Sequence, residues 1–438
     1  MIMILNLIQQ CLTVRVLSVM QVIPLFRGTE GVLWLPASVA MLSVFWIYFK
    51  MLNIAHAKGL VDNPGARKLQ KRPVPVVGGL CVLFGVICAV LVGSCLMDCS
   101  KLVPILMAMV VMTGVGALDD FEGLTAKIRL LIEVVIVLAL IFGGGGCIDD
   151  LHGTWGIDGF SWYVGVPFTV FACVGIINAI NMIDGVNGLS SGLCFTCSLL
   201  FAYVFYRGQD WQHAMLCLSM AAGLFPFLLH NVMGKTSKMF LGDAGTMMMG
   251  VLMAWCVIQV LRSDSTSNWV ESHRGMNVVA LTLAILAVPV FDTVRVMLLR
   301  IIHGRSPFAA DKTHLHHLLY TYSASHSLTS LGEIFLNLFI CLCFAIAYWL
   351  HWGLDVQLYV VIAASIFLVW GTYFFLNRNY QLKTGIAYRL HRRLVEARQG
   401  EKEWWKALQD FIDTPRQWGF KTKGECAITR KQTPSSHS

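Results

Sequence analysis

Charged residues are scarce in this chain of 438 residues. They make up 13% of it, while apolar residues make up 56%; a typical soluble domain carries roughly 25% charge. This shortage excludes a soluble globular fold. A membrane-spanning helix needs about 20 mostly apolar residues, and eleven such stretches are present, near residues 34–52, 79–97, 102–118, 130–147, 162–180, 190–206, 213–230, 245–261, 277–298, 331–350 and 356–376. We therefore predict an all-α, polytopic integral membrane protein with about eleven transmembrane helices.

Two familiar kinds of site are also missing. Most of the fourteen cysteines stand inside apolar stretches, where a free thiol packs as a small hydrophobic group. Cys194 and Cys197 form a C-x-x-C pair but have no soluble redox domain around them. The glycine run at 143–146 lacks the Lys-Ser/Thr ending of a phosphate-binding loop. A disulfide framework, redox chemistry and a phosphate-binding loop are therefore not indicated.

Positive charge is present, but it is unevenly distributed. Much of the net charge of +8 lies after residue 377 and between the first two apolar stretches, so no nucleic-acid partner is expected. Lys and Arg gather in cytoplasmic loops beside the spans, so the basic loop between the first two apolar stretches should face the cytoplasm. We therefore predict the N-terminus outside and the C-terminus in the cytoplasm. Four further loops then face the cytoplasm, near 119–129, 181–189, 231–244 and 299–330.

This topology divides the chain into three parts. Residues 1–33 are an N-terminal extension or an interfacial segment, 34–376 form the transmembrane catalytic domain, and 377–438 form a basic cytoplasmic tail. The tail combines arginines with Trp404 and Trp405. It is either a partly helical segment on anionic lipid headgroups or an ordinary solvated tail.

Five polar clusters interrupt the apolar pattern, and all fall on the predicted cytoplasmic side. Carboxylates at a membrane edge are costly and usually functional. The clusters are D-N-P-G-A-R-K at 62–68, D-D at 119–120 with a lysine at 127, N-A-I-N-M-I-D-G-V-N-G at 178–188, F-L-G-D-A-G at 240–245, and R-S-P-F to D-K-T-H-L-H-H at 305–317.

Each cluster also has a structural interpretation. The first could be a proline-glycine turn. The acidic pair at 119–120 could cap the next helix or bound a turn, and the aspartate at 243 could cap the helix that it begins. Three histidines so close together suggest zinc, but no further ligand completes a tetrahedral set, and Arg305 and Lys312 would repel a cation. Anion or sugar binding is therefore favoured. Asp292 and Arg295 could form a structural pair or contact a substrate, and both interpretations stay open.

Together the clusters combine three kinds of group. Carboxylates and an amide suit Mg²⁺, basic residues suit a diphosphate, and an aromatic side chain suits a base. They predict phosphoryl transfer from a nucleotide-linked substrate to a lipid at the membrane surface.

In order and spacing, these motifs resemble those of the polyprenyl-phosphate N-acetylhexosamine-1-phosphate transferase family. The resemblance covers roughly residues 45–320, and the S-P-F to H-L-H-H stretch is similar to that of the bacterial WecA-type enzymes. It implies that Asp243 and Asn181 hold Mg²⁺, with Mn²⁺ as a substitute. It also implies that Asp119 lies by the attacking lipid phosphate, with Asp120 and Asp184 beside it as catalytic residues.

The resemblance also implies a set of substrate contacts. A glycine and an asparagine would face the uracil with an aromatic ring stacked on it, a lysine would contact phosphate, and an arginine with three histidines would contact the diphosphate or sugar. In that order they are Gly185, Asn187, Phe240, Lys127, Arg305, His314, His316 and His317. Two positions depart from the family: Gln70 replaces a histidine, and Asn187 replaces an aspartate but still offers uracil a donor and an acceptor.

The reaction implied is transfer of N-acetylhexosamine-1-phosphate, most simply GlcNAc-1-phosphate, from a UDP-sugar to undecaprenyl phosphate with release of UMP. The enzyme would initiate O-antigen or related glycan synthesis in the bacterial inner membrane, with its site facing the cytoplasm. Another sugar (GalNAc, a deoxy-amino sugar or MurNAc-pentapeptide) is the nearest alternative. An ion-coupled transporter is the alternative of another class, although it would place charges near the midplane of the spans. A homodimer is left open.

Overall fold

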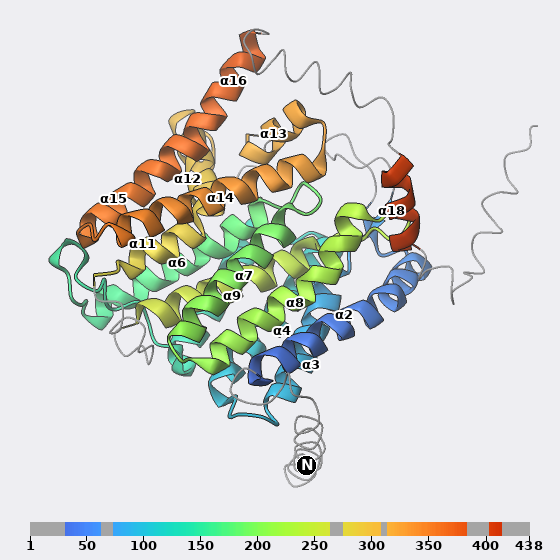
Figure 1. Ribbon diagram of the computed structural model, residues 1–438, viewed down its shortest axis with the longest axis horizontal. Helices are drawn as coiled ribbons and strands as arrows, with labels where there is room; N and C mark the ends of the chain where they lie inside the picture. Colours follow the sequence, from blue (N-terminus) through green and yellow to red (C-terminus); the bar gives the residue numbers. More distant parts are fainter. Residues whose placement is uncertain (1–30, 63–72, 263–274, 308–312, 383–402, 414–438) are drawn as a thin grey trace, which may run out of the picture.

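The computed structural model describes residues 31–62, 73–262, 275–307, 313–382 and 403–413. Within these ranges the chain is almost entirely helical, as predicted (Figure 1). The helices are α2 (Gly31–Lys58), α3 (Gly78–Gly93), α4 (Val103–Glu122), α5 (Ala126–Leu140), α6 (Trp162–Met182), α7 (Leu189–Arg207), α8 (Trp211–Met233), α9 (Gly242–Leu261), α11 (Val278–Ile285), α12 (Ala287–Ile302), α13 (Leu315–Ser323), α14 (His326–Trp349), α15 (Leu354–Ser365), α16 (Thr372–Leu382) and α18 (Glu403–Asp413).

Short elements complete this part of the chain. Strands β1 (Val61–Asp62) and β2 (Val74–Pro75) pair antiparallel beside the predicted site. A π-helical segment, Ile141–Gly145, extends α5, and another, Ile366–Gly371, joins α15 to α16. The described cysteines are all free thiols, as the sequence indicated.

Each of the eleven apolar stretches coincides with helix, but two differ from simple spans. Nine described segments are long and apolar enough to cross a membrane. Helix α3 has only 16 residues, fewer than the approximately 20 that a full crossing needs. Helices α11 and α12 together would make a tenth span, but they meet at an angle of 79°.

The break between α11 and α12 has a local cause. Pro289 stands in the first turn of α12 and has no amide hydrogen to continue a helix from α11. Asn337 of α14 takes over the hydrogen bonds that the break would leave unmade. Its Oδ1 accepts from the Val288 amide at 3.0 Å, and its Nδ2 donates to the Ile285 carbonyl at 2.9 Å. Main-chain groups without a partner are costly away from water.

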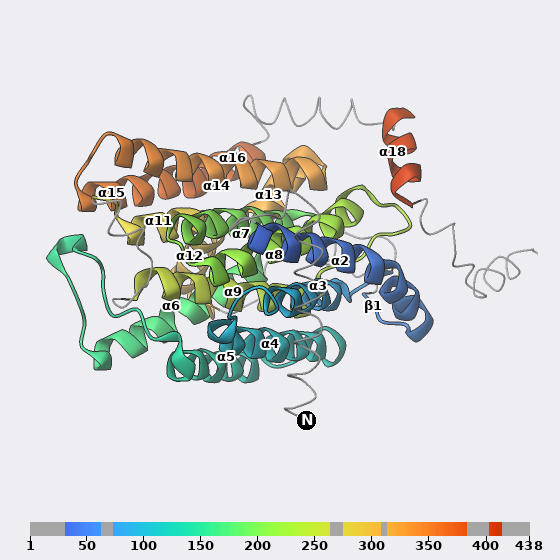
Figure 2. The same ribbon diagram turned by 60° about the horizontal axis from the view of Figure 1, so that its bottom comes forward.

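Helix α9 is the centre of the bundle. Every residue in it except Asp243 is buried, and it lies between the layer of α4 and α5 and the layer of α7 and α8 (Figure 2). Glycines allow α3 and α4 to approach its first turn. A Cβ atom on Gly79 would lie 2.3 Å from the Gly245 nitrogen, and one on Gly116 would lie 2.4 Å from the main chain of Asp243. The start of α9 is therefore held by direct main-chain contact.

The connecting segments gather at two ends of the bundle. At one end, the 181–189, 231–244 and 313–317 segments contact one another. At the other end, Asn277 donates to Thr154 Oγ1 at 3.0 Å, and the Trp155 amide donates to Asp355 at 2.7 Å. This alternation agrees with the predicted grouping of the loops. Which end faces the cytoplasm stays a prediction.

Candidate active site

Asp120 fixes the first turn of α9. Its Oδ1 accepts a hydrogen bond from the Asp243 amide at 3.0 Å, and its Oδ2 accepts one from the Ala244 amide at 3.1 Å. These amides have no partner within their own helix, so a carboxylate there stabilises the helix start. Gly242 has a φ of +73°, and a Cβ atom on it would lie 2.5 Å from Asp120 Oδ2. Asp120 is thus a cap, but for a helix far along the chain.

Asp243 is held from a second side by α6. Asn181 Nδ2 donates to Asp243 Oδ1 at 2.7 Å and to Thr246 Oγ1 at 2.9 Å. Because Asn181 makes both of these bonds through its nitrogen, its amide oxygen stays available as a metal ligand. The structure therefore brings together the two residues that the sequence assigned to the metal.

Asp119 has partners that sequence reasoning missed. Its Oδ1 accepts from the Leu124 amide at 2.7 Å, and its Oδ2 accepts from Arg129 Nη1 at 3.1 Å. Arg129 Nε also lies 3.8 Å from Oε1 of Glu133, whose Oε2 accepts from Asn178. Glu133 is buried inside an apolar helix, and a charge in such a segment is the signal that could have indicated it.

Asp184 completes the group of carboxylates from the loop between α6 and α7. Its Oδ1 accepts from Ser190 Oγ at 2.8 Å. The Asp184 side chain is exposed on one side, while the protein around its other sides removes part of its hydration. This loss of hydration raises the pKa of Asp184 to about 7. The hydrogen bond from Ser190 acts to lower this pKa, and the negative charge of Asp243 acts to raise it further.

Four carboxylates therefore converge at one end of the bundle. Asp119, Asp120 and Asp184 each lie close enough to Asp243 for their charges to interact. Like charges repel strongly where water is partly excluded, so the arrangement favours a bound cation. The described residues contain no group of three or more His, Cys, Asp or Glu placed to hold a metal. Mg²⁺ does not need one, because it usually takes one or two carboxylates and completes its shell with water and phosphate oxygens.

Asp292 and Arg295 hold residues 313–317, called the histidine segment below, in place. Arg295 Nη2 donates to Asp292 Oδ1 at 2.7 Å and to the Thr313 carbonyl at 2.6 Å. Asp292 also accepts from the Leu315 amide at 3.2 Å and lies 2.8 Å from His314 Nδ1. Both side chains are buried. The pair therefore has the structural role, one of the two roles that the sequence left open.

The histidine segment lies against the 181–189 loop. A Cβ atom on Gly185 would lie 3.1 Å from His316 Nε2 and 3.7 Å from His317 Cε1. His316 stacks on His314 with ring centroids 5.6 Å apart. Burial, followed by the charges of His317 and His314, lowers the pKa of His316 well below its ordinary value. Its ring is therefore neutral at pH 7.

The other predicted substrate residues lie at the same end but have different surroundings. Lys127 and Arg305 are exposed. The Asn187 amide donates to His326 Nδ1 at 3.2 Å, and its carbonyl accepts from Ser330 at 2.8 Å. The main chain of Phe240 pairs with the segment after β2. Residues 63–72, including Gln70, and residues 308–312 lie outside the described residues.

Asn231 is a further residue that the sequence did not indicate. Its Oδ1 accepts from the Gly188 amide at 2.7 Å, and its Nδ2 donates to the Met239 carbonyl at 2.7 Å. It is 4% exposed. One buried amide therefore joins the loop that carries Asp184 to the loop that leads into Asp243.

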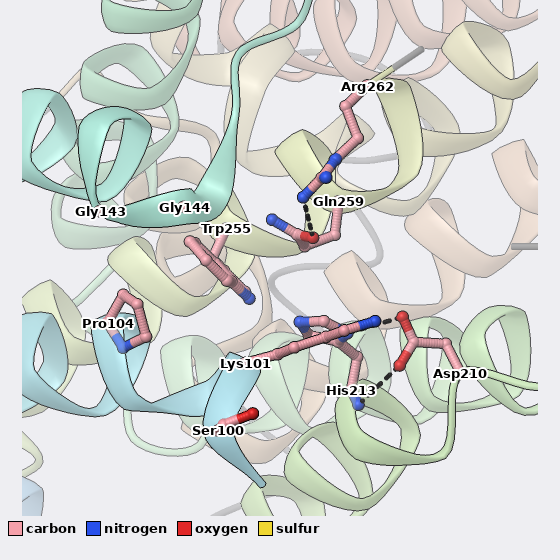
Figure 3. A pocket seen from close by; sticks show the side chains of 10 residues that line it. All are labelled: Ser100, Lys101, Pro104, Gly143, Gly144, Asp210, His213, Trp255, Gln259 and Arg262. Carbon is pink, nitrogen blue, oxygen red and sulfur yellow. Dashed lines mark hydrogen bonds and ion pairs between the residues drawn. The ribbon is translucent and has the colours of Figure 1, made fainter. Parts of the chain in front are cut away.

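A separate cavity of about 300 Å³ lies at the opposite end of α4 and α9 (Figure 3). His213 Nδ1 lies 2.7 Å from Asp210 Oδ2, and Lys101 points toward the same carboxylate. Arg262 Nη1 donates to Gln259 Oε1 at 3.2 Å. Gly143 and Gly144 also line this cavity, so the glycine run lies away from the carboxylates.

The fold and the carboxylate cluster define a multi-pass helical membrane protein with an acidic centre at one end of its bundle. The sequence profile of Glycosyl transferase family 4 matches residues 102–261, which contain the four carboxylates and Asn181. The chain belongs to this family.

Curated relatives carry more specific names. The chain is 31% identical over 278 residues to the undecaprenyl-phosphate alpha-N-acetylglucosaminyl 1-phosphate transferase of Yersinia pestis. This alignment covers 62% of the chain and 72% of the relative. It is 30% identical to the protein of that name from Escherichia coli K12, over 64% of this chain and 74% of the relative. A probable undecaprenyl-phosphate N-acetylglucosaminyl 1-phosphate transferase of Bacillus subtilis is 29% identical, over 67% and 78%.

Proposed function

We propose that this protein transfers GlcNAc-1-phosphate from UDP-GlcNAc to undecaprenyl phosphate, releases UMP, and thereby initiates O-antigen or related envelope glycan synthesis. One observation carries the proposal: Asp119, Asp120, Asp184, Asn181 and Asp243 converge at one end of a membrane bundle. The names of the relatives support the acceptor and the sugar. The site would face the cytoplasm of a bacterial inner membrane, where a soluble nucleotide-sugar meets the lipid.

The metal in this proposal is Mg²⁺, with Asp243 and Asn181 as its ligands. Their oxygens are the hard ligands that this ion prefers, and the repulsion among the four carboxylates favours a cation at this place. When bound, Mg²⁺ offsets the negative charge of the diphosphate.

The reaction is a direct displacement at phosphorus. An oxygen of the lipid phosphate attacks the β-phosphorus of UDP-GlcNAc, and a new P–O bond forms. The bond from the β-phosphorus to the bridging oxygen breaks, and that oxygen leaves with UMP. A phosphate monoester has a second pKa of about 6, so the attacking group is already largely dianionic at pH 7. Asp119, oriented by Arg129, would position the lipid phosphate or accept its remaining proton.

The donor would lie between the 181–189 loop and the histidine segment. Gly185 and Asn187 would face the uracil, Phe240 would stack on it, and His316 would reach the diphosphate or sugar. The short distance between His316 and Gly185 supports this placement. Lys127, Arg305, His314 and His317 would supply further contacts to phosphate or sugar.

The test is Mg²⁺-dependent release of UMP by the purified chain with undecaprenyl phosphate and a panel of UDP-sugars. We expect UDP-GlcNAc to be the best donor. If no UDP-sugar gives lipid-dependent UMP, the proposed function is wrong. Incubation with UDP-GlcNAc alone tests the mechanism, because a phosphorylated Asp119 or Asp120 would require a covalent route instead.

A further inference from the structure

The C-terminal helix α18 contacts the loop between α8 and α9. Asp413, its last residue, is 8% exposed. Its Oδ2 accepts from the amides of Lys235 at 3.2 Å and Thr236 at 3.0 Å. Its Oδ1 accepts from the Ser237 amide at 3.2 Å and from Ser237 Oγ at 2.6 Å. A single carboxylate thus receives hydrogen bonds from three successive amides and a hydroxyl.

These bonds give the loop a partner from far along the chain. Burial acts to raise the pKa of Asp413, but the hydrogen bonds from Ser237 and the neighbouring amides outweigh it and hold this pKa below its ordinary value. The carboxylate is therefore ionised at neutral pH, where bonds to a charged acceptor are stronger than bonds between neutral groups. Figure 1 shows α18 beside the ends of α8 and α2, apart from the other helices.

The contacted loop leads directly into the candidate active site. The Ser237 carbonyl accepts from Tyr48 Oη at 2.8 Å, and the Met239 carbonyl accepts from Asn231 at 2.7 Å. The next residue, Phe240, pairs with the segment after β2 through its main chain. The loop leads into the first turn of α9, which contains Asp243, whose amide is bound by Asp120. Asp413 thus holds the start of this loop by hydrogen bonds, and Asp120 holds the helix turn that follows its end.

We propose that Asp413 is a positioning residue: through α18 it clamps the α8–α9 loop and so sets the positions of Phe240 and Asp243 for binding of the nucleotide-sugar and its metal. This inference rests on the proposed function. It also assigns a role to the tail that the sequence left open between a membrane-surface helix and a solvated segment. The apolar side chain of Phe411 on the same helix is 76% exposed, whereas Asp413 makes the hydrogen bonds to the loop.

The test uses the full chain with Asp413→Asn, and Asp410→Asn as the matched control. Asp410 is an exposed carboxylate on the same helix. Hydrogen exchange is measured at 234–241, and KM and kcat are measured for UDP-GlcNAc. In Asp413→Asn we expect faster exchange in this loop and a KM raised about tenfold, the scale of a lost bond to a charged group, with kcat within about twofold. Asp410→Asn should match the wild type, and Asp413→Glu should restore part of the affinity.

The outcomes separate this inference from the function on which it rests. If the wild type releases UMP and Asp413→Asn leaves both KM and loop exchange unchanged, the clamp is wrong and the function stands. If the wild type releases no UMP, the function is wrong; unchanged exchange in Asp413→Asn would then reject the clamp as well. Should Asp413→Asn fail to fold, Ser237→Ala removes the 2.6 Å bond to Asp413 together with the 3.2 Å contact to His230 Nδ1, and a wild-type KM and loop exchange in that variant would overturn the proposal.

Discussion

The two ends of the helix bundle differ in how their charged side chains are arranged: like charges gather at one end, and opposite charges pair at the other. At the end that carries Asp243, four carboxylates interact, and Arg129 bonds to one of them. At the other end, Asp210 lies beside His213 and Lys101. Burial acts to raise the pKa of Asp210, but the hydrogen bond and charge of His213, together with the charge of Lys101, hold this pKa below its ordinary value.

This difference distinguishes residues that serve catalysis from residues that stabilise the fold. A carboxylate that caps a helix and lies beside basic groups, as Asp210 does, stabilises the fold without a ligand. Like charges gathered in a partly dehydrated place destabilise it until a cation or proton arrives. Substitutions at the carboxylate end should therefore reduce activity more than stability, and those at the opposite end should do the reverse.

The largest expected effect is that of Asp243→Ala, which removes the proposed metal ligand. UMP release should fall by about three orders of magnitude, the scale of losing electrostatic stabilisation of the reacting phosphates. The melting temperature should stay the same or rise, because one of four like charges is gone. Full UMP release in this variant would remove the central support for the proposed function.

Asp120→Ala should come next, because it frees two amides at the start of α9. We expect UMP release to fall about a hundredfold and the free energy of unfolding to fall by about 1 kcal/mol, as for a lost helix cap. Asp120→Asn keeps an acceptor and is the matched control. Asparagine keeps one acceptor oxygen for one of the two amides, so we expect a smaller loss than in Asp120→Ala, and equal losses would contradict a role for the remaining capping bond.

Glu133→Gln tests the buried network behind Asp119. Without its negative charge, Glu133 no longer orients Arg129, from which it lies 3.8 Å away. UMP release should fall about tenfold, the scale of losing a residue that orients a ligand. Asn178→Ala perturbs the same carboxylate from its other side and should not add fully to it. Fully additive losses would mean that the two residues act separately.

Asp210→Ala addresses the opposite end. Asp210 caps α8 through the His213 amide at 3.3 Å, so its loss should lower the free energy of unfolding by about 1 kcal/mol. UMP release per folded molecule should stay within about twofold of wild type. A loss like that of Asp120→Ala would break the contrast between the two ends.

The smallest expected effect concerns Asp184, whose pKa is raised from 3.8 to about 7 in the folded chain. The folded state therefore binds this proton more tightly than the unfolded state, and stability falls as the pH rises from about 4 to 7. In buffer without Mg²⁺, melting temperatures measured across this range should decline less in Asp184→Asn than in wild type. Parallel curves would contradict the raised pKa.

The sequence predicted local features well and distant contacts poorly. Each predicted hydrophobic run coincides with a helix in the described residues, because such a run is a local property of the chain. These runs did not indicate the bend between α11 and α12, which depends on Asn337 from another helix. Composition also could not show that α3 has only 16 residues.

The same limit applies to the site. Motif spacing identified Asp119, Asp184 and Asp243, whereas Asn231 and Asp413 make their contacts with loops that no local pattern connects to them. The sequence offered Asp120 as a possible cap of the next helix but favoured a functional role for it. Its helix, however, begins more than one hundred residues later, so only the fold reveals which amides it binds.

The main-chain contacts at Gly79, Gly116 and Gly245 have a consequence for redesign. Because α3 and α4 meet the main chain of α9 at Gly79 and Gly116, there is no side chain at these points to exchange for a smaller one, and enlarging either would push against the first turn of α9. An engineer who wants a different sugar accepted should therefore leave the helices alone and diversify the 181–189 loop and the histidine segment.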